Sequence, residues 1–131
     1  MMDTSALIAA LVADHEHHSI CRPYLSVDLQ LPAIVLAETF AQLRRTFGQP
    51  AGTASAVLQP WSSRPDHILP TTSATAAKIF GRAVELDLAG SIHDALIAQV
   101  CADNHVPIVT LDGRQHRLAL AIGARSTYLL A

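Results

Sequence analysis

Four times along this chain, a short apolar run gives way to a pattern of helical periodicity. An acid stands at or just past each transition: Asp3, Glu38, Asp94 and Asp112. Strands that alternate with helices indicate a parallel sheet covered by helices on both faces. In such a fold the strand-to-helix junctions gather at one edge of the sheet. We therefore expect four carboxylates that are distant in sequence to converge in space.

The spacing of apolar residues predicts the individual elements. Helices are expected at residues 5–13, 15–27, 36–47, 51–61, 72–88, 91–104 and 113–122. Strands are expected at residues 31–36, 66–69, 106–110 and 126–130, with Met1 and Met2 as a very short first strand. The fold class is therefore α/β, with one domain over residues 1–131 and a central parallel sheet of about five strands.

Composition sets the limits of this fold. Half of the 131 residues are apolar and 15% are charged, which suits one well-formed core and excludes general disorder. The net charge of −2 gives no overall electrostatic attraction to nucleic acid, although it does not exclude such a partner.

Cysteine content and hydropathy indicate the cellular compartment. Cys21 and Cys101 both fall in apolar helical contexts, so we expect buried free thiols, which fits a reducing cytosol. The start of the chain lacks the basic region of a signal peptide and soon reaches Asp3 and Asp14, and no apolar run is long enough to cross a bilayer. We expect a soluble, cytoplasmic protein with no membrane partner.

Each acid alone has a simple structural explanation. Asp3 and Asp112 have the position of helix N-caps, and Ser91 to Asp94 has the spacing of a capping box. Glu38 in a first helical turn would favour the helix dipole. Four converging carboxylates, however, repel one another unless a cation lies among them, and hard oxygen ligands favour Mg²⁺ or Mn²⁺. Together the acids indicate a metal-dependent site.

The residues around the acids also resemble a known family. The segments are Asp3-Thr4-Ser5-Ala6-Leu7, Ala37-Glu38, Asp94-Ala95-Leu96-Ile97-Ala98 and Thr110-Leu111-Asp112. Together they resemble the PIN-domain ribonucleases, and within that family the VapC-type toxins of bacterial toxin–antitoxin pairs. The resemblance runs from residue 3 to the C-terminus and implies a single PIN-like α/β/α sandwich.

The resemblance also implies roles for the acids. In PIN domains such acids hold one or two Mg²⁺ or Mn²⁺ ions. We expect Asp3 and Asp94 to be the principal direct ligands, and Glu38 and Asp112 to complete a second position or orient water. The supporting hydroxyls would be those of Thr4, Ser5 and Thr110. The chain differs from the family pattern in its very short first strand and in Gly113, which stands where a charged residue is common.

The implied activity is that of an endoribonuclease, which hydrolyses RNA by metal-activated water and leaves 5′-phosphate and 3′-hydroxyl ends. The implied partners are a cognate VapB-type antitoxin and a second copy of the chain. Candidate RNA-contacting residues are Arg44, Arg45, Arg114 and Arg117, which could position phosphates, although an ordinary surface role is equally compatible with each. Two alternatives are a PIN nuclease of RNA maturation without an antitoxin and a catalytically silent PIN binding module.

Other residues have weaker claims to function. His15-Glu16-His17-His18 invites a metal interpretation, but it lacks the spacing that places two imidazoles at i and i+4 of a helix. A solvated helix face is the favoured prediction for this segment. His93, beside Asp94, could contact substrate or simply start a helix, and we expect Trp61 to serve packing.

Overall fold

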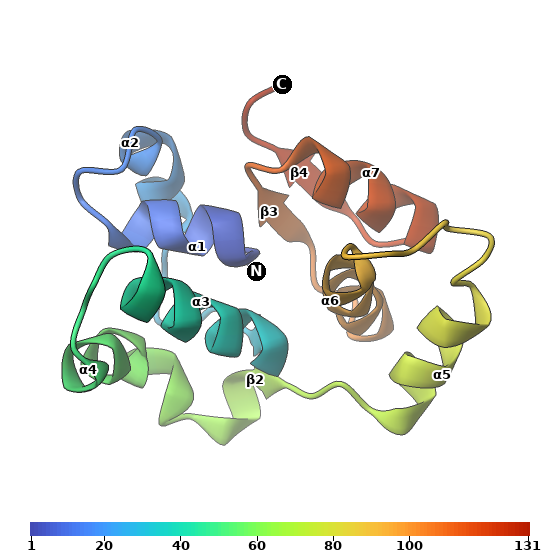
Figure 1. Ribbon diagram of the computed structural model, residues 1–131, viewed down its shortest axis with the longest axis horizontal. Coiled ribbons are helices and arrows are strands. Elements are labelled where there is room, and N and C mark those ends of the chain that lie inside the picture. Colours follow the sequence, from blue (N-terminus) through green and yellow to red (C-terminus); the bar gives the residue numbers. More distant parts are fainter.

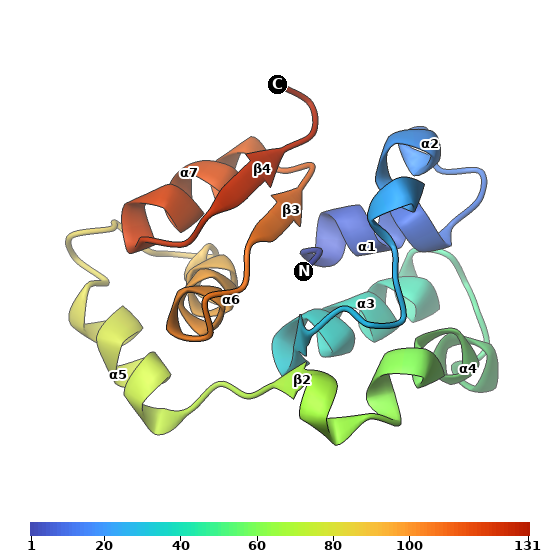
Figure 2. The same ribbon diagram turned by 180° about the vertical axis from the view of Figure 1, so that it is seen from behind.

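The computed structural model describes every residue from Met1 to Ala131 and is drawn from two sides in Figures 1 and 2. The helices are α1 (Thr4–Leu11), α2 (His18–Cys21), α3 (Ala33–Arg45), α4 (Ala51–Ser62), α5 (Ser73–Gly81), α6 (Ile92–Asp103) and α7 (Gly113–Ile122). Single turns of 3-10 helix lie at Arg22–Tyr24 and Pro65–His67. The strands are β1 (Leu31–Pro32), β2 (Ile68–Leu69), β3 (Ile108–Thr110) and β4 (Ser126–Tyr128).

Every strand pairing in the molecule is parallel, as the alternation of strands and helices predicts. β3 pairs with β4, and Met2 forms an isolated parallel bridge to Val109 on the other side of β3. β1 pairs with β2 as a separate two-stranded unit. The predicted α/β architecture with helices around parallel strands is confirmed, but the five extended segments form two groups and not one continuous ladder.

Two helices form the centre of the core. In α1 the run from Ala6 to Ala10 is buried, and in α6 the run from Ile97 to Cys101 is buried as well. Helices that are apolar on most of their circumference belong in the interior, where each fully buried leucine or isoleucine contributes about 1.5–3 kcal/mol. α1 packs on α3, and α6 packs on α5 and α7. Side chains at the N-terminal ends of α1 and α6 are therefore held on rigid supports.

The predicted strand over residues 31–36 is wrong beyond Pro32, because the chain becomes helical at Ala33. An apolar run of this length is compatible with either a strand or a buried helix. The burial of Val35, Thr39 and Leu43, at steps of four, shows that the segment continues as a helix with one buried face. Pro32 favours a helix that begins at Ala33, since the fixed φ of proline suits a helix start.

The predicted helix over residues 15–27 is also wrong in extent. Only His18–Cys21 is α-helical, and a 3-10 turn follows at Arg22–Tyr24, where Pro23 supplies no backbone N–H to continue the helix. The expected helix over residues 72–88 stops at Gly81, and a series of turns follows in which Asp87 has a φ of +50°. The remaining helices agree with prediction to within about three residues at each end.

Two smaller expectations are confirmed. Cys21 and Cys101 are free and buried. Trp61 is a packing residue, buried in the core, and its Nε1–H donates to the carbonyl oxygen of Ser26 at 2.9 Å. None of the helices combines the length and the apolar character that crossing a bilayer requires.

Candidate active site

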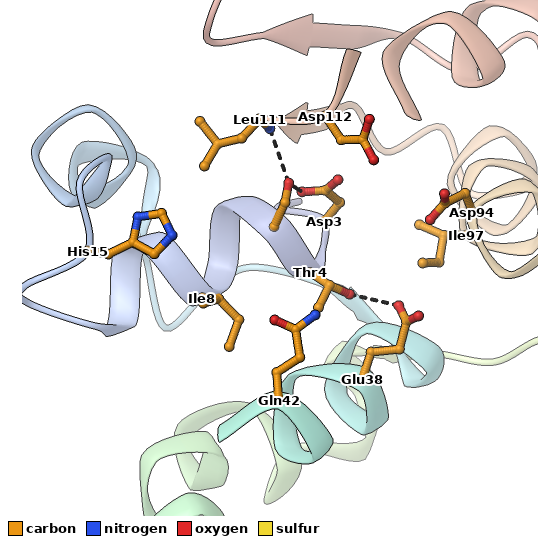
Figure 3. A pocket seen from close by; sticks show the side chains of 11 residues that line it. Asp3, Thr4, Ile8, His15, Glu38, Gln42, Asp94, Ile97, Leu111 and Asp112 are labelled. Carbon is orange, nitrogen blue, oxygen red and sulfur yellow. Dashed lines mark hydrogen bonds between the residues drawn. The ribbon is translucent and has the colours of Figure 1, made fainter. Parts of the chain in front are cut away.

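A cavity of about 320 Å³ lies where α1, α3, α6 and the β3–α7 junction meet. All four predicted acids line it, and Figure 3 shows their carboxylates facing a common space. The other lining residues are Thr4, Ser5, Ile8, His15, Gln42, Ile97 and Leu111. The fold thus brings together acids that span residues 3 to 112 of the sequence.

Asp3 is buried and forms the N-cap of α1. Its Oδ1 accepts hydrogen bonds from the backbone N–H of Ala6 at 3.0 Å and from Ser5 Oγ at 2.7 Å, while Oδ2 accepts from Thr110 Oγ1. Burial raises the pKa of the Asp3 carboxyl, and these hydrogen bonds oppose that rise. The capping interpretation is therefore correct, and the capped conformation also directs Asp3 toward β3.

Two hydroxyls connect Asp3 to the segment that carries Asp112. Thr110 Oγ1 accepts the backbone N–H of Asp112 at 2.9 Å, and Ser5 Oγ accepts the backbone N–H of Leu111 at 3.2 Å. Each hydroxyl donates its proton to Asp3, and its oxygen accepts a backbone N–H of the β3–α7 junction. Ser5 and Thr110 thus fix the position of one acid relative to another.

Glu38 reaches the cavity from α3. Because α3 begins at Ala33, Glu38 lies in the second turn, and the explanation by the helix dipole is wrong. Its Oε1 accepts a hydrogen bond from Thr4 Oγ1 at 2.8 Å. Thr4 therefore links the acid of α3 to the N-terminal end of α1, immediately next to Asp3.

Asp94 is the acid with no hydrogen-bond partner for its carboxylate in the protein. It lies in the first turn of α6, but neither Asp94 nor Ser91 makes the side-chain bonds of a capping box, so that explanation is wrong. Burial raises the pKa of Asp94 to about 6, and the negative charges of Asp112, Glu38 and Asp3 contribute to this rise. The Arg114 guanidinium opposes it. Asp94 therefore experiences the electrostatic field of the three other acids.

Asp112 caps α7 as expected, because its Oδ1 accepts the backbone N–H of Arg114 at 2.8 Å. A second bond holds the helices that carry the two acids together: Gln115 Nε2 donates to the carbonyl oxygen of Asp94 at 3.2 Å. Gln115 is buried, so this contact is shielded from water. The separation of Asp94 from Asp112 is thereby set by the packing of α6 on α7.

The donor set fits a small divalent cation that keeps part of its water shell. No three acid, histidine or cysteine side chains lie close enough to hold an ion directly. Mg²⁺ commonly binds through one or two carboxylates and retains several waters. Asp94 has all its acceptor sites free, and Asp3, with three of about four sites used, has one left. Asp94 is thus the acid best suited to direct ligation, whereas Asp3 has fewer free acceptor sites than Glu38, which accepts a single bond from Thr4.

The predicted RNA-contacting arginines divide into two pairs. Arg114 and Arg117 lie on α7 close to the acids; Arg117 Nη1 is 3.3 Å from the point that a Cβ on Gly113 would occupy. Arg44 Nη1 instead donates to the carbonyl oxygen of Gln49, and none of the four arginines lines the cavity itself. The glycine after Asp112 thus allows a guanidinium to approach the beginning of α7. His93 is exposed and does not line the cavity.

Two polar residues of the site, His15 and Gln42, are not predicted by the sequence pattern. His15 is expected on a solvated helix face, but it lies in a turn after α1 and lines the cavity. Gln42 follows Glu38 by four residues, so the two side chains lie on the same face of α3. This spacing predicts Gln42 as a site residue once the helix is known to begin at Ala33.

Comparison with known proteins gives the family. The family model described as PIN domain matches residues 1–120. Among solved structures, a chain from the structure of FitAB bound to an IR36 DNA fragment is similar, with a TM-score of 0.66 and 18% sequence identity. That match covers 99% of this chain and 94% of the other chain, and at this identity it shows a shared fold. No curated protein is similar enough in sequence to be matched to the chain. The family model covers most of the sequence, and the chain therefore belongs to the PIN domain family.

Proposed function

We propose that this chain is a Mg²⁺- or Mn²⁺-dependent endoribonuclease and the toxin of a VapBC-type toxin–antitoxin pair. PIN domains are generally nucleases that depend on divalent metal ions, which supports the class of reaction. The observation that carries the proposal is the cavity itself, in which one carboxylate, Asp94, is held near three others without any partner from the protein. Such an arrangement is stable at neutral pH when a cation balances the charge.

Each residue has a role in this proposal. Asp94 and Asp3 bind the ion directly, and Glu38 and Asp112 complete a second position or orient water. When bound, the ion supplies Lewis-acid activation of water and neutralises charge around the phosphorus. Ser5 and Thr110 hold Asp3 in place. Thr4 holds Glu38 in the same way, and these hydroxyls keep the carboxylates in position before the substrate arrives.

In this proposal the residues that bind the phosphates of RNA lie on α7. Arg114 and Arg117 lie beside Asp112 and offer bidentate donors to the RNA backbone, without reading its sequence. Arg44 and Arg45 lie in the last turn of α3, and Arg44 donates to the carbonyl oxygen of Gln49, so we assign these two residues no substrate contact.

The toxin part of the proposal rests on the family and on a second cavity. This cavity, also of about 320 Å³, has mostly apolar walls formed by α1, α3 and α4, among them Leu11, Leu43 and Phe47. An apolar groove of this kind suits a segment of a VapB-type antitoxin. The similar chain comes from a complex named FitAB on DNA, in keeping with a protein that works with a partner. We also propose that the protein forms a homodimer and acts in the cytoplasm.

The test is cleavage of labelled single-stranded RNA by the purified protein. We expect cleavage with Mg²⁺ or Mn²⁺, none with EDTA, and a loss of roughly 100-fold or more in Asp94→Asn. Asp66→Asn is the matched control, because Asp66 is an exposed acid outside the cavity and its loss should leave the rate unchanged. Cleavage that persists with EDTA and in Asp94→Asn would contradict the metal site. Antitoxin binding with no cleavage at any metal concentration would favour a silent binding module.

A further inference from the structure

One end of the site cavity contains no acid. It is lined by Ile8, His15 and Gln42. In Figure 3 His15 and Asp94 lie at opposite ends of the cavity, with Ile8 and Gln42 between them. Ile8 and Gln42 each follow a residue of the acidic end, Thr4 and Glu38, by four residues, which is about 6 Å along each helix axis. The cavity thus continues beyond the acids by a length comparable with one nucleotide.

The imidazole of His15 is held in place by the turn that carries it. The backbone N–H of His15 donates to the carbonyl oxygen of Val12 at 3.0 Å, and its carbonyl oxygen accepts from the backbone N–H of His18. The ring of His18 donates through Nδ1 to the carbonyl oxygen of Ala9 at 2.9 Å, which anchors the turn to α1. His15 is therefore fixed relative to the helix that also carries the acidic end of the cavity.

The hydrogen bonds also determine which proton His15 can offer. The backbone N–H of His17 donates to Nδ1 of His15 at 3.0 Å, so Nδ1 carries no proton. Nε2 then carries a proton, and it has no partner within the protein. His15 thus presents a positioned N–H donor at the wall of the cavity.

Gln42 completes the polar part of this end. It is exposed on α3, and its side-chain amide makes no hydrogen bond to the protein, so both its donor and its acceptor are free. Ile8 supplies apolar wall between His15 and Gln42, and Leu111 supplies apolar wall on the opposite side of the cavity. A ring N–H donor, an amide and apolar surface are suited to the edge and face of a base, and no arginine or lysine lines this end to bind a phosphate.

We propose that His15, Gln42 and Ile8 form a subsite that binds the base of the nucleotide adjoining the scissile phosphate of RNA. The subsite sets the base preference of cleavage at that position. This inference rests on the proposed ribonuclease function. Because the donor and the amide are placed before the substrate binds, they add affinity with little ordering cost.

The experiment measures cleavage of a pool of random-sequence, single-stranded RNA with Mn²⁺, followed by sequencing of the ends and by steady-state kinetics on one preferred sequence. The variants are Gln42→Met, which keeps the size and removes the hydrogen bonds, and His15→Ala. Gln59→Met is the control, since Gln59 is an exposed glutamine of α4 outside the cavity. His15→Gln restores an N–H donor and serves as the rescue variant.

We expect Gln42→Met and His15→Ala each to raise KM about threefold to tenfold, with kcat within about twofold, as befits the loss of a binding contact. The base preference next to the cut should weaken in both variants, and His15→Gln should recover part of it. Wild-type cleavage with unchanged KM and base preference in both variants would overturn the subsite and leave a protein partner as the occupant of this end. A fall in kcat alone would equally overturn it, because that result indicates displaced acids. Failure of the wild type to cleave with any metal would instead overturn the proposed function.

Discussion

Replacing Asp94 with Asn should stabilise the metal-free protein at neutral pH. The folded protein holds Asp94 with a pKa of about 6, against 3.8 for an unperturbed carboxyl. A folded pKa above the unfolded one means that the native state binds the proton more tightly. The stability that this provides is fully present below about pH 4 and is lost as the pH rises through 6. At pH 7.5 the ionised Asp94 therefore costs stability, and an amide at that position avoids the cost.

The size of the effect follows from the pKa. Each unit of difference corresponds to about 1.36 kcal/mol, so roughly two units set an upper limit of about 3 kcal/mol. The Asp94 side chain is partly exposed, and solvent screening reduces this limit to about 1–2 kcal/mol. In a domain of this size the gain amounts to an increase of roughly 3–8 °C in Tm.

Urea unfolding in EDTA measures the prediction directly. The free energy of unfolding of Asp94→Asn should exceed that of the wild type by about 1–2 kcal/mol at pH 7.5 and by nearly nothing at pH 4, with equal m-values. Asp66→Asn should match the wild type at both values of pH. Mg²⁺ at 100 times the wild-type Kd should then stabilise the wild type by about 2.7 kcal/mol and a variant that binds tenfold more weakly by about 1.4 kcal/mol, so the advantage of Asp94→Asn should shrink by about 1.3 kcal/mol. A variant that is less stable than the wild type in EDTA at pH 7.5, or a difference that does not depend on pH, would refute the reasoning.

Three further predictions concern individual contacts. Thr110→Val removes the donor to Oδ2 of the buried Asp3 and leaves the Asp112 N–H without an acceptor, so it should lower the free energy of unfolding by about 1–3 kcal/mol and reduce cleavage; an unchanged urea midpoint would count against it. Arg117→Gln should reduce the slope of log Kd for RNA against log salt concentration by about one, while Arg44→Gln should leave the slope unchanged. Equal slopes in the two variants would contradict a phosphate contact by Arg117. Trp61→Phe removes the bond to the Ser26 carbonyl and should cost about 1 kcal/mol in urea unfolding, whereas full stability would mean that the bond contributes nothing.

The acids could be found from the sequence because each is marked by its neighbours. Asp3 and Asp112 precede helices and do cap them, so local rules locate them correctly. Glu38 was identified together with a strand that ends at Pro32, and its position in the second turn of α3 follows from the tertiary burial of Val35 and Thr39. Here the resemblance of Ala37-Glu38 to PIN domains was more reliable than the assignment of the secondary structure.

His15 shows why the rest of the site was not predictable. Apolar spacing over residues 15–27 is typical of a helix, but hydrogen bonds of the turn, from His15 to Val12 and from His17 to the His15 ring, replace the helical ones. The spacing of apolar residues gives no information about a side chain that accepts a hydrogen bond from a nearby backbone N–H. The cavity then depends on how this turn packs beside α3, which is a tertiary property.

Calorimetric titration of Mn²⁺ into the protein at pH 7.5 tests the central claim, that the converging acids form a cation site, without requiring knowledge of the RNA target. The wild type and Asp66→Asn should bind Mn²⁺ with the same Kd. Asp94→Asn should bind at least about tenfold more weakly, since it lacks the carboxylate assigned as a direct ligand. Equal affinity in all three proteins, or no binding by the wild type, would contradict the account.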